Sequence, residues 1–189
     1  MKKKLLLFIT LGILFSIIYY LASTKSYNQV IQTYKNESSA EYRPYTINGL
    51  EDYMFCVSKN QVEPYQQELL VLYQKKMWGL FNFNRYRIIE RTESSAGQIV
   101  GTYFLQYEKE KGAVIFYSSN PVKISLYEIQ FQENGIRGKL SGMVSQEESF
   151  VVGITEIGKS KYQYRKYDAA LFYDEDNNII EHQGNYVIE

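Results

Sequence analysis

The chain opens with a long apolar run, and segments of alternating polarity follow it. From Leu5 to Ala22 the sequence is apolar except at Thr10, Gly12 and Ser16. At about 1.5 Å per helical residue, this run of 18 residues (5 to 22) would be roughly 27 Å long, close to the ~30 Å thickness of a bilayer's hydrocarbon core. The run has no polar face, which distinguishes it from an amphipathic helix of a soluble core. The pattern therefore predicts a transmembrane helix.

The residues that flank this run predict its orientation. Lysines occupy positions 2–4, and positively charged residues next to a spanning helix stay on the cytoplasmic side. Tyr19 and Tyr20 lie near the other end, where aromatic side chains prefer the interface between lipid and water. We therefore predict a single-pass cell-membrane protein, in which residues 1–24 form a signal anchor, the N-terminus is cytoplasmic and the rest of the chain is extracytoplasmic.

A cleaved signal peptide is the alternative interpretation of the same segment. The apolar region of a signal peptide has roughly 7–15 residues and ends at small residues in an A-x-A-like arrangement. The nearest triplets, over 21–23 and 22–24, contain Leu21 or Thr24 where a small residue is needed. These poor cleavage sites favour the anchor over secretion after signal cleavage. Both interpretations place residues 25–189 outside the cytoplasm.

The remaining chain has the pattern of an antiparallel sheet protein. Residues 25–44 are mostly polar, and we interpret them as a juxtamembrane spacer before an extracytoplasmic β-rich domain over 45–189. Short apolar or alternating segments separated by turn residues predict β-strands. The fold class is therefore α+β, a transmembrane helix followed by a mainly antiparallel sheet domain with one or two short helices. The predicted strands cover 68–75, 80–91, 99–107, 113–118, 122–131, 136–144, 149–157, 161–173, 179–182 and 186–188.

Three segments need separate interpretation. Leu50, Tyr53, Met54 and Val57 have the i, i+3, i+4, i+7 spacing of one helix face, which predicts a short helix at 49–59.

Residues 64–78 could form a long helix instead of a strand, because Pro64 could start it and Gly79 could end it. Within 122–131 the apolar positions are even up to 126 and odd from 127. One strand cannot keep a single buried face through such a change, so a bulge or bend is expected between 126 and 127.

Composition and charge exclude several classes of protein. Formal net charge is +0, and without the three N-terminal lysines 18 basic residues face 21 acidic ones, a balance of −3. A nucleic-acid-binding domain would carry a basic stripe, so we expect no nucleic-acid partner. The single cysteine, Cys56, rules out an intramolecular disulfide, and its apolar neighbours predict a buried thiol. The 19 tyrosines and only 3 prolines favour ordered strands over a disordered stalk.

Candidate catalytic and metal-binding residues are few. His182 is the only histidine, no G-x-S-x-G motif is present, and one Cys with one His is too few for a structural zinc site. No glycine-rich phosphate loop occurs, so we expect no cofactor and no enzyme activity. Asp174, Asp176 and Asn178 alternate as calcium ligands do, but the sixth and twelfth positions of this pattern lack the glycine and glutamate of a calcium loop. A polar turn is the better interpretation of these weak metal candidates.

One aromatic and basic cluster is a candidate binding surface. Such side chains can stack against sugars or a partner chain, although they can equally cover a sheet with arginines at its rim. The cluster consists of Trp78, Phe81, Phe83, Arg85, Tyr86 and Arg87.

These observations favour a non-catalytic binding or interaction module of the cell envelope. We expect it to contact the membrane through residues 5–22 and to bind an envelope glycan or a protein partner. A glycan hydrolase that uses two carboxylates is one alternative, and it would need two acids that converge in a cleft. An accessory subunit of a membrane complex, whose apolar helix contacts a partner helix, is the other.

Overall fold

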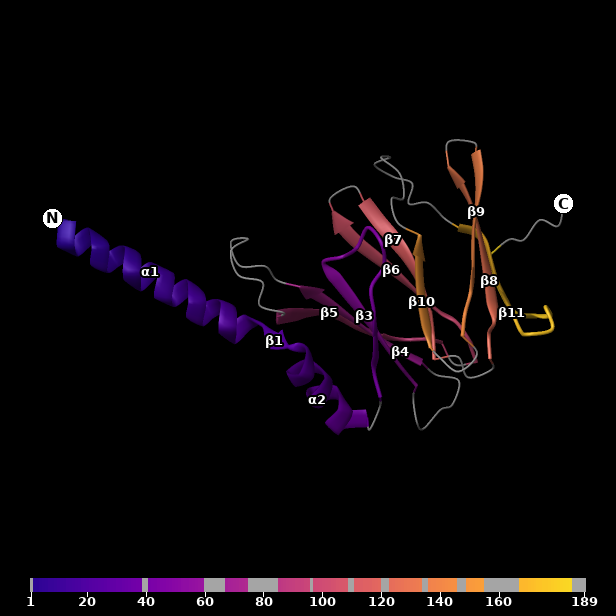
Figure 1. Ribbon diagram of the computed structural model, residues 1–189, viewed down its shortest axis with the longest axis horizontal. Coiled ribbons are helices and arrows are strands. Elements are labelled where there is room, and N and C mark those ends of the chain that lie inside the picture. The colour runs from indigo at the N-terminus through magenta and orange to yellow at the C-terminus, as the bar shows by residue number, and fades with distance from the viewer. Residues whose placement is uncertain are drawn as a thin grey trace.

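The computed structural model describes residues 2–38, 41–59, 67–74, 85–95, 97–108, 111–119, 123–133, 136–145, 149–154 and 167–184. An apolar helix at the N-terminus leads into a domain of antiparallel strands (Figure 1). The α+β fold class expected from the sequence is thereby confirmed.

Two helices occur in the described part of the chain, α1 (Lys2–Ser23) and α2 (Tyr27–Ser38). Helix α1 projects away from the strands (Figure 1), and its apolar side chains are exposed along the helix, as at Phe8, which is 72% exposed. It is therefore not a core helix of the domain. The stretch Lys4–Ser23 is long and apolar enough to cross a membrane, a test that a signal sequence would also pass.

The described strands form three antiparallel sheets, which we name by their distance from α2. The helix-side sheet has the order β1-β5-β4-β3-β2, the central sheet β10-β7-β6 and the far sheet β12-β11-β8-β9. The helix-side strands are β1 (Lys25–Ser26), β2 (Arg43–Tyr45), β3 (Tyr53–Lys59), β4 (Gln67–Gln74) and β5 (Arg85–Glu93). The central strands are β6 (Gly101–Glu108), β7 (Lys111–Ser118) and β10 (Phe150–Ile154), and the far strands are β8 (Leu126–Glu133), β9 (Ile136–Met143), β11 (Tyr167–Tyr173) and β12 (Ile179–Gly184).

Strand β7 is buried on both faces and sets the order of the layers. Ala113, Ile115 and Tyr117 pack in one core with the helix-side sheet. Val114 and Phe116 point the other way and pack in a second core with the far sheet. Because successive side chains of a strand alternate between faces, this continuous apolar strand needs a partner layer on each side. The central sheet accordingly lies between the other two (Figure 1).

Strand β4 of the helix-side sheet is also buried on both faces. Leu69 and Val71 face the central sheet, whereas Leu70 and Leu72 form a third core with Val30 of α2. Helix α2 is thus the cover of the helix-side sheet. The segment 25–44, which we interpreted as a spacer, contributes β1, α2 and part of β2 and packs on this sheet.

The predicted helix at 49–59 is wrong, because residues 53–59 form β3. Phe55 and Val57 pack toward the central sheet, while Cys56 and Met54 pack toward α2. A strand that is buried on both faces is an uninterrupted apolar run, and such a run contains helical spacings by coincidence. The alternative of a helix over 64–78 is also wrong within the described residues, since 67–74 form β4.

The bulge predicted between residues 126 and 127 is also wrong. Strand β8 begins at Leu126 and keeps its register with β9 and β11 through these residues. The bend lies earlier, at Lys123, whose φ of 58° is in the left-handed region. Ile124 is buried before the strand begins, so its side chain is not part of the alternation along β8. Residues 161–166 and 186–188, both predicted to be strands, lie outside the described residues.

Shortening the side chain of Phe116 should destabilise the protein strongly. Its ring is fully buried and lies 5.9 Å from that of Phe172 of the far sheet. Phe116→Ala would leave a cavity between two layers, and such substitutions cost about 3–5 kcal/mol in the free energy of unfolding. Urea unfolding of the full-length protein in detergent micelles measures the loss. Phe104→Ala is the control on the same sheet, because Phe104 is 39% exposed and should cost much less. Equal losses would contradict the layer arrangement.

Candidate functional site

The aromatic and basic cluster predicted from the sequence is only partly described. Trp78, Phe81 and Phe83 lie outside the described residues. Tyr86 is buried under α2, where its ring meets that of Tyr27 edge-on at 6.5 Å. Arg87 is exposed. In the described part, Tyr86 is therefore a core residue and Arg87 a surface residue.

Arg85, the third described member of the cluster, binds the end of α1. Its Nε donates a hydrogen bond to Thr24 Oγ1 at 2.8 Å. Its Nη2 donates to the carbonyl oxygens of Leu21 at 3.0 Å and Thr24 at 2.5 Å. The last carbonyls of a helix have no partner inside the helix and carry partial negative charge, so a guanidinium is favoured there. Arg85 thereby connects α1 to β5 of the helix-side sheet.

The weak metal candidates form a turn. Asp174 Oδ1 accepts hydrogen bonds from the backbone nitrogens of Asp176 at 2.9 Å and Asn178 at 2.8 Å, and Oδ2 accepts one from Asn178 Nδ2 at 3.1 Å. The donors of Asn178, followed by that of Asp176, hold the pKa of Asp174 below its usual value. These carboxylate oxygens close the turn between β11 and β12. Among the described residues, no group of three or more His, Cys, Asp or Glu converges in a way that could hold a metal ion.

Glu181 and His182 have separate surroundings. The Glu181 carboxylate accepts hydrogen bonds from the backbone nitrogens of Ile99 at 2.7 Å and Val100 at 3.0 Å, while His182 is exposed. Gln67, buried in the helix-side sheet, donates to the carbonyl of Ile99 from its Nε2. Glu181 of the far sheet and Gln67 of the helix-side sheet therefore both bind the segment before β6, and their roles are structural.

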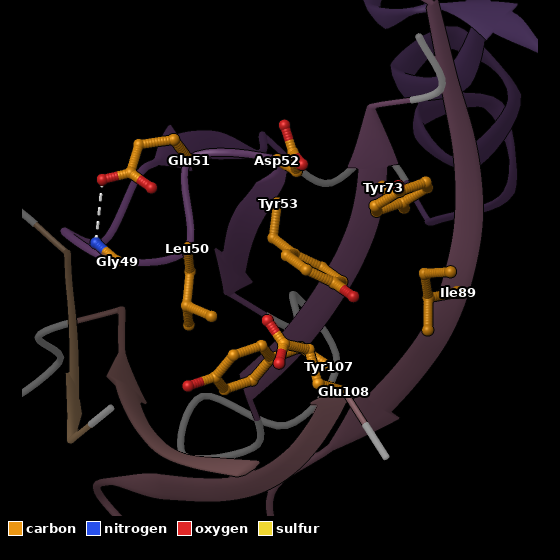
Figure 2. A pocket seen from close by; sticks show the side chains of 9 residues that line it. All are labelled: Gly49, Leu50, Glu51, Asp52, Tyr53, Tyr73, Ile89, Tyr107 and Glu108. Atoms are coloured by element: carbon orange, nitrogen blue, oxygen red, sulfur yellow. Dashed lines mark hydrogen bonds between the residues drawn. The ribbon is translucent and has the colours of Figure 1, made fainter. Parts of the chain in front are cut away.

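An open cleft of about 510 Å³ lies where the helix-side and central sheets meet (Figure 2). Tyr53 of β3, Tyr73 of β4 and Tyr107 of β6 provide its aromatic surface, and Leu50 and Ile89 add apolar surface. Tyr53 and Tyr73 are paired across adjacent strands, and their ring centroids are 5.2 Å apart. The pairing of β3 with β4 therefore creates the aromatic part of the cleft.

Carboxylates surround these tyrosines. Glu51, Asp52 and Glu108 also line the cleft (Figure 2). Burial raises the pKa of Tyr53 above its usual value, and negative charge on its neighbours, including Asp52 and Glu108, raises it further. Lys111, the first residue of β7, forms an exposed ion pair with Glu108 at 2.9 Å. Among the described residues that line the cleft, three are carboxylates and none is a lysine or an arginine, so the lining itself is acidic.

Sequence reasoning missed this cleft. Its residues come from the turn at 49–52, the start of β3, the end of β4, the middle of β5 and the end of β6. No local motif connects them, and the expected helix at 49–59 would have placed Tyr53 in another environment. The tyrosine content was the available signal, but it could not indicate which rings meet.

Comparison with protein-family models, curated proteins and solved structures finds no match. The geometry of the described residues is therefore the basis for any functional conclusion.

Cys56 is fully buried between the helix-side sheet and α2, as expected from the sequence. Burial raises the pKa of its thiol to about 12, against a smaller opposing effect of a hydrogen bond with Tyr27. Because the thiolate is the reactive form, this cysteine is a packing residue at physiological pH.

The thiol of Cys56 should be unreactive in the folded protein even in mild alkali. An exposed thiol becomes a thiolate as the pH rises through about 8.5, whereas a thiol with a raised pKa stays protonated. We expect no reaction of the folded full-length protein with a thiol-reactive disulfide reagent between about pH 8 and pH 10, and full reaction in denaturant. In a Ser95→Cys variant, the exposed introduced thiol should react, faster as the pH rises. Comparable rates for both thiols would contradict the burial of Cys56.

Proposed function

We propose that this protein is a single-pass membrane-anchored binding module without chemistry of its own. Its domain faces the outside of the cell membrane and binds a basic segment of an envelope polypeptide in the cleft between the helix-side and central sheets. Support for the anchor comes from α1, whose apolar side chains are exposed around the helix. An apolar surface of this size is unfavourable in water and is suited to a bilayer. The lysines at 2–4 favour a cytoplasmic N-terminus under the positive-inside rule.

Contacts at the end of α1 support an anchor that stays on the chain. Arg85 binds the carbonyls of Leu21 and Thr24, and Tyr20 is buried. Thr24 is buried as well, and its hydroxyl donates to the carbonyl of Tyr20 at 2.7 Å. Cleavage near residue 22 would remove the acceptor at Leu21 and the buried Tyr20 from the joint. Because the domain contacts the end of α1 in this way, an uncleaved anchor is favoured over a cleaved signal peptide.

The observation that carries the binding function is the combination of tyrosine rings and carboxylates in one cleft. A cation is attracted to the face of an aromatic ring and to a carboxylate, so a lysine or arginine side chain can use both. Its apolar stem would lie on Tyr53 and Tyr73, and its charge would meet Asp52 or Glu108. The volume of about 510 Å³ is within the usual range of ligand sites.

Structural roles of the cleft carboxylates favour binding over hydrolysis. Glu51 accepts a hydrogen bond from the backbone nitrogen of Gly49 at 2.9 Å, and Glu108 pairs with Lys111. A hydrolase needs one carboxylate as acid and the other as base or nucleophile, at a defined separation across the scissile bond. Glu51 and Glu108, which support a turn and a strand end, are better suited to attracting a cation than to acid–base chemistry.

Removing the charges of the cleft should weaken the binding of a basic peptide. Asp52→Asn combined with Glu108→Gln keeps the size of both side chains and removes two negative charges. We expect about a tenfold rise in the Kd for fluorescent deca-lysine, measured by anisotropy with the full-length protein in detergent micelles, equivalent to about 1.4 kcal/mol.

The matched control removes two charges far from the cleft, by Asp168→Asn with Glu175→Gln in and beyond β11, where both side chains are exposed. The control should bind deca-lysine as the wild type does. Equal weakening by both double variants would show general charge attraction and would refute the cleft. Turnover of an envelope glycan by the purified protein would refute the non-catalytic function.

A further inference from the structure

We propose a second ligand site, for the phosphate of an anionic phospholipid, in a pocket where α1 meets the helix-side sheet. The pocket has a volume of about 480 Å³ and lies apart from the cleft, with which it shares no lining residue. The inference rests on the proposed membrane anchoring by α1, because that anchoring places the pocket at the lipid surface.

The pocket combines cationic and neutral polar side chains. Lys25 of β1 and Arg85 of β5 line it, together with Gln29 and Gln32 on the first turns of α2. No carboxylate is among its lining residues in the described part of the chain. This contrasts with the balance of −3 for the chain beyond its N-terminal lysines. The pocket is therefore a positive site on an otherwise acidic domain, which favours an anion.

Arg85 keeps its charge available to such an anion. Within the described part of the chain, its partners are neutral oxygens, the hydroxyl of Thr24 and the carbonyls of Leu21 and Thr24. These contacts fix the guanidinium without neutralising its charge. An arginine held in place loses little conformational freedom when it binds a phosphate. Lys25 is exposed in the same lining and supplies a second positive charge.

The expected position of the pocket relative to the bilayer identifies the anion. The apolar stretch Lys4–Ser23 has 20 residues, and at about 1.5 Å per residue a helix of this length crosses the ~30 Å hydrocarbon core. Thr24 and Lys25 then lie in the headgroup layer. Leu21 and Ala22 form the apolar side of the pocket, next to the acyl chains. A phosphate that is joined to a lipid fits both parts of this lining, whereas a free phosphate would use the polar part alone.

Lipid retention tests the site in the full-length protein. The protein is placed in nanodiscs with equal amounts of phosphatidylglycerol and phosphatidylcholine, and native mass spectrometry counts the lipids that remain bound after release. We expect preferential retention of one phosphatidylglycerol. Lys25→Gln removes one cation and leaves the Arg85 contacts with α1 intact. Gln32→Glu places a carboxylate in the pocket. Each variant should lower retention about tenfold.

A matched control and a competition arm make the outcome decisive. Lys123→Gln removes an exposed cation far from the pocket and should retain the lipid as the wild type does. Equal retention of the two lipids, or unchanged retention in both pocket variants, would refute the site. Displacement of the lipid by inorganic phosphate alone would show a site for free phosphate and would overturn the lipid assignment. Extraction of the protein from membranes by alkaline carbonate would instead refute the anchoring itself.

Discussion

Strands β4 and β7 carry apolar side chains on both faces, so each needs a covering layer on either side before the chain can fold. Leu70 and Leu72 of β4 are covered by α2 through Val30, and β7 fills the space between the two outer sheets. Burial of apolar surface is the dominant favourable contribution to folding, and these two strands bring nearly every described element into contact with a core. The stack of helix and three sheets follows from their composition. Removing α2 would expose one face of β4 to water.

The cover over β4 also fixes where the N-terminal helix leaves the domain. Only three residues, 24–26, separate α1 from α2, and β1 among them pairs with Arg85 and Tyr86 of β5. Arg85 adds its hydrogen bonds to the last carbonyls of α1. Few rotatable residues separate the helix from the sheet, so α1 and the domain are joined closely. If α1 spans the membrane, the domain is held at the membrane surface, with the basic pocket at the headgroups and the acidic cleft on another part of the domain.

Much of the architecture was predictable from local pattern, and the candidate sites were not. The apolar N-terminal run and most strand positions follow from periodicity alone. Strand β3 was mistaken for a helix because an apolar run buried on both faces has no single periodicity. Glycine normally weakens a strand, but in β9 the rings of Phe131 and Tyr127 from the paired strand lie over Gly138 and Gly142 and occupy the space of the missing side chains. Both the cleft and the pocket depend on strand pairings between distant segments, which no local signal reveals.

Exposure of the β-rich domain to the outside of the cell underlies both proposed sites, and labelling of an introduced thiol tests it most directly. Met143 at the end of β9 is 89% exposed, and the native Cys56 is fully buried, so a Met143→Cys variant offers one reactive thiol in the described part of the folded chain. A membrane-impermeant maleimide should label this variant in intact cells and leave the wild type unlabelled. Labelling only after the cells are permeabilised would place the domain in the cytoplasm and contradict the proposed topology.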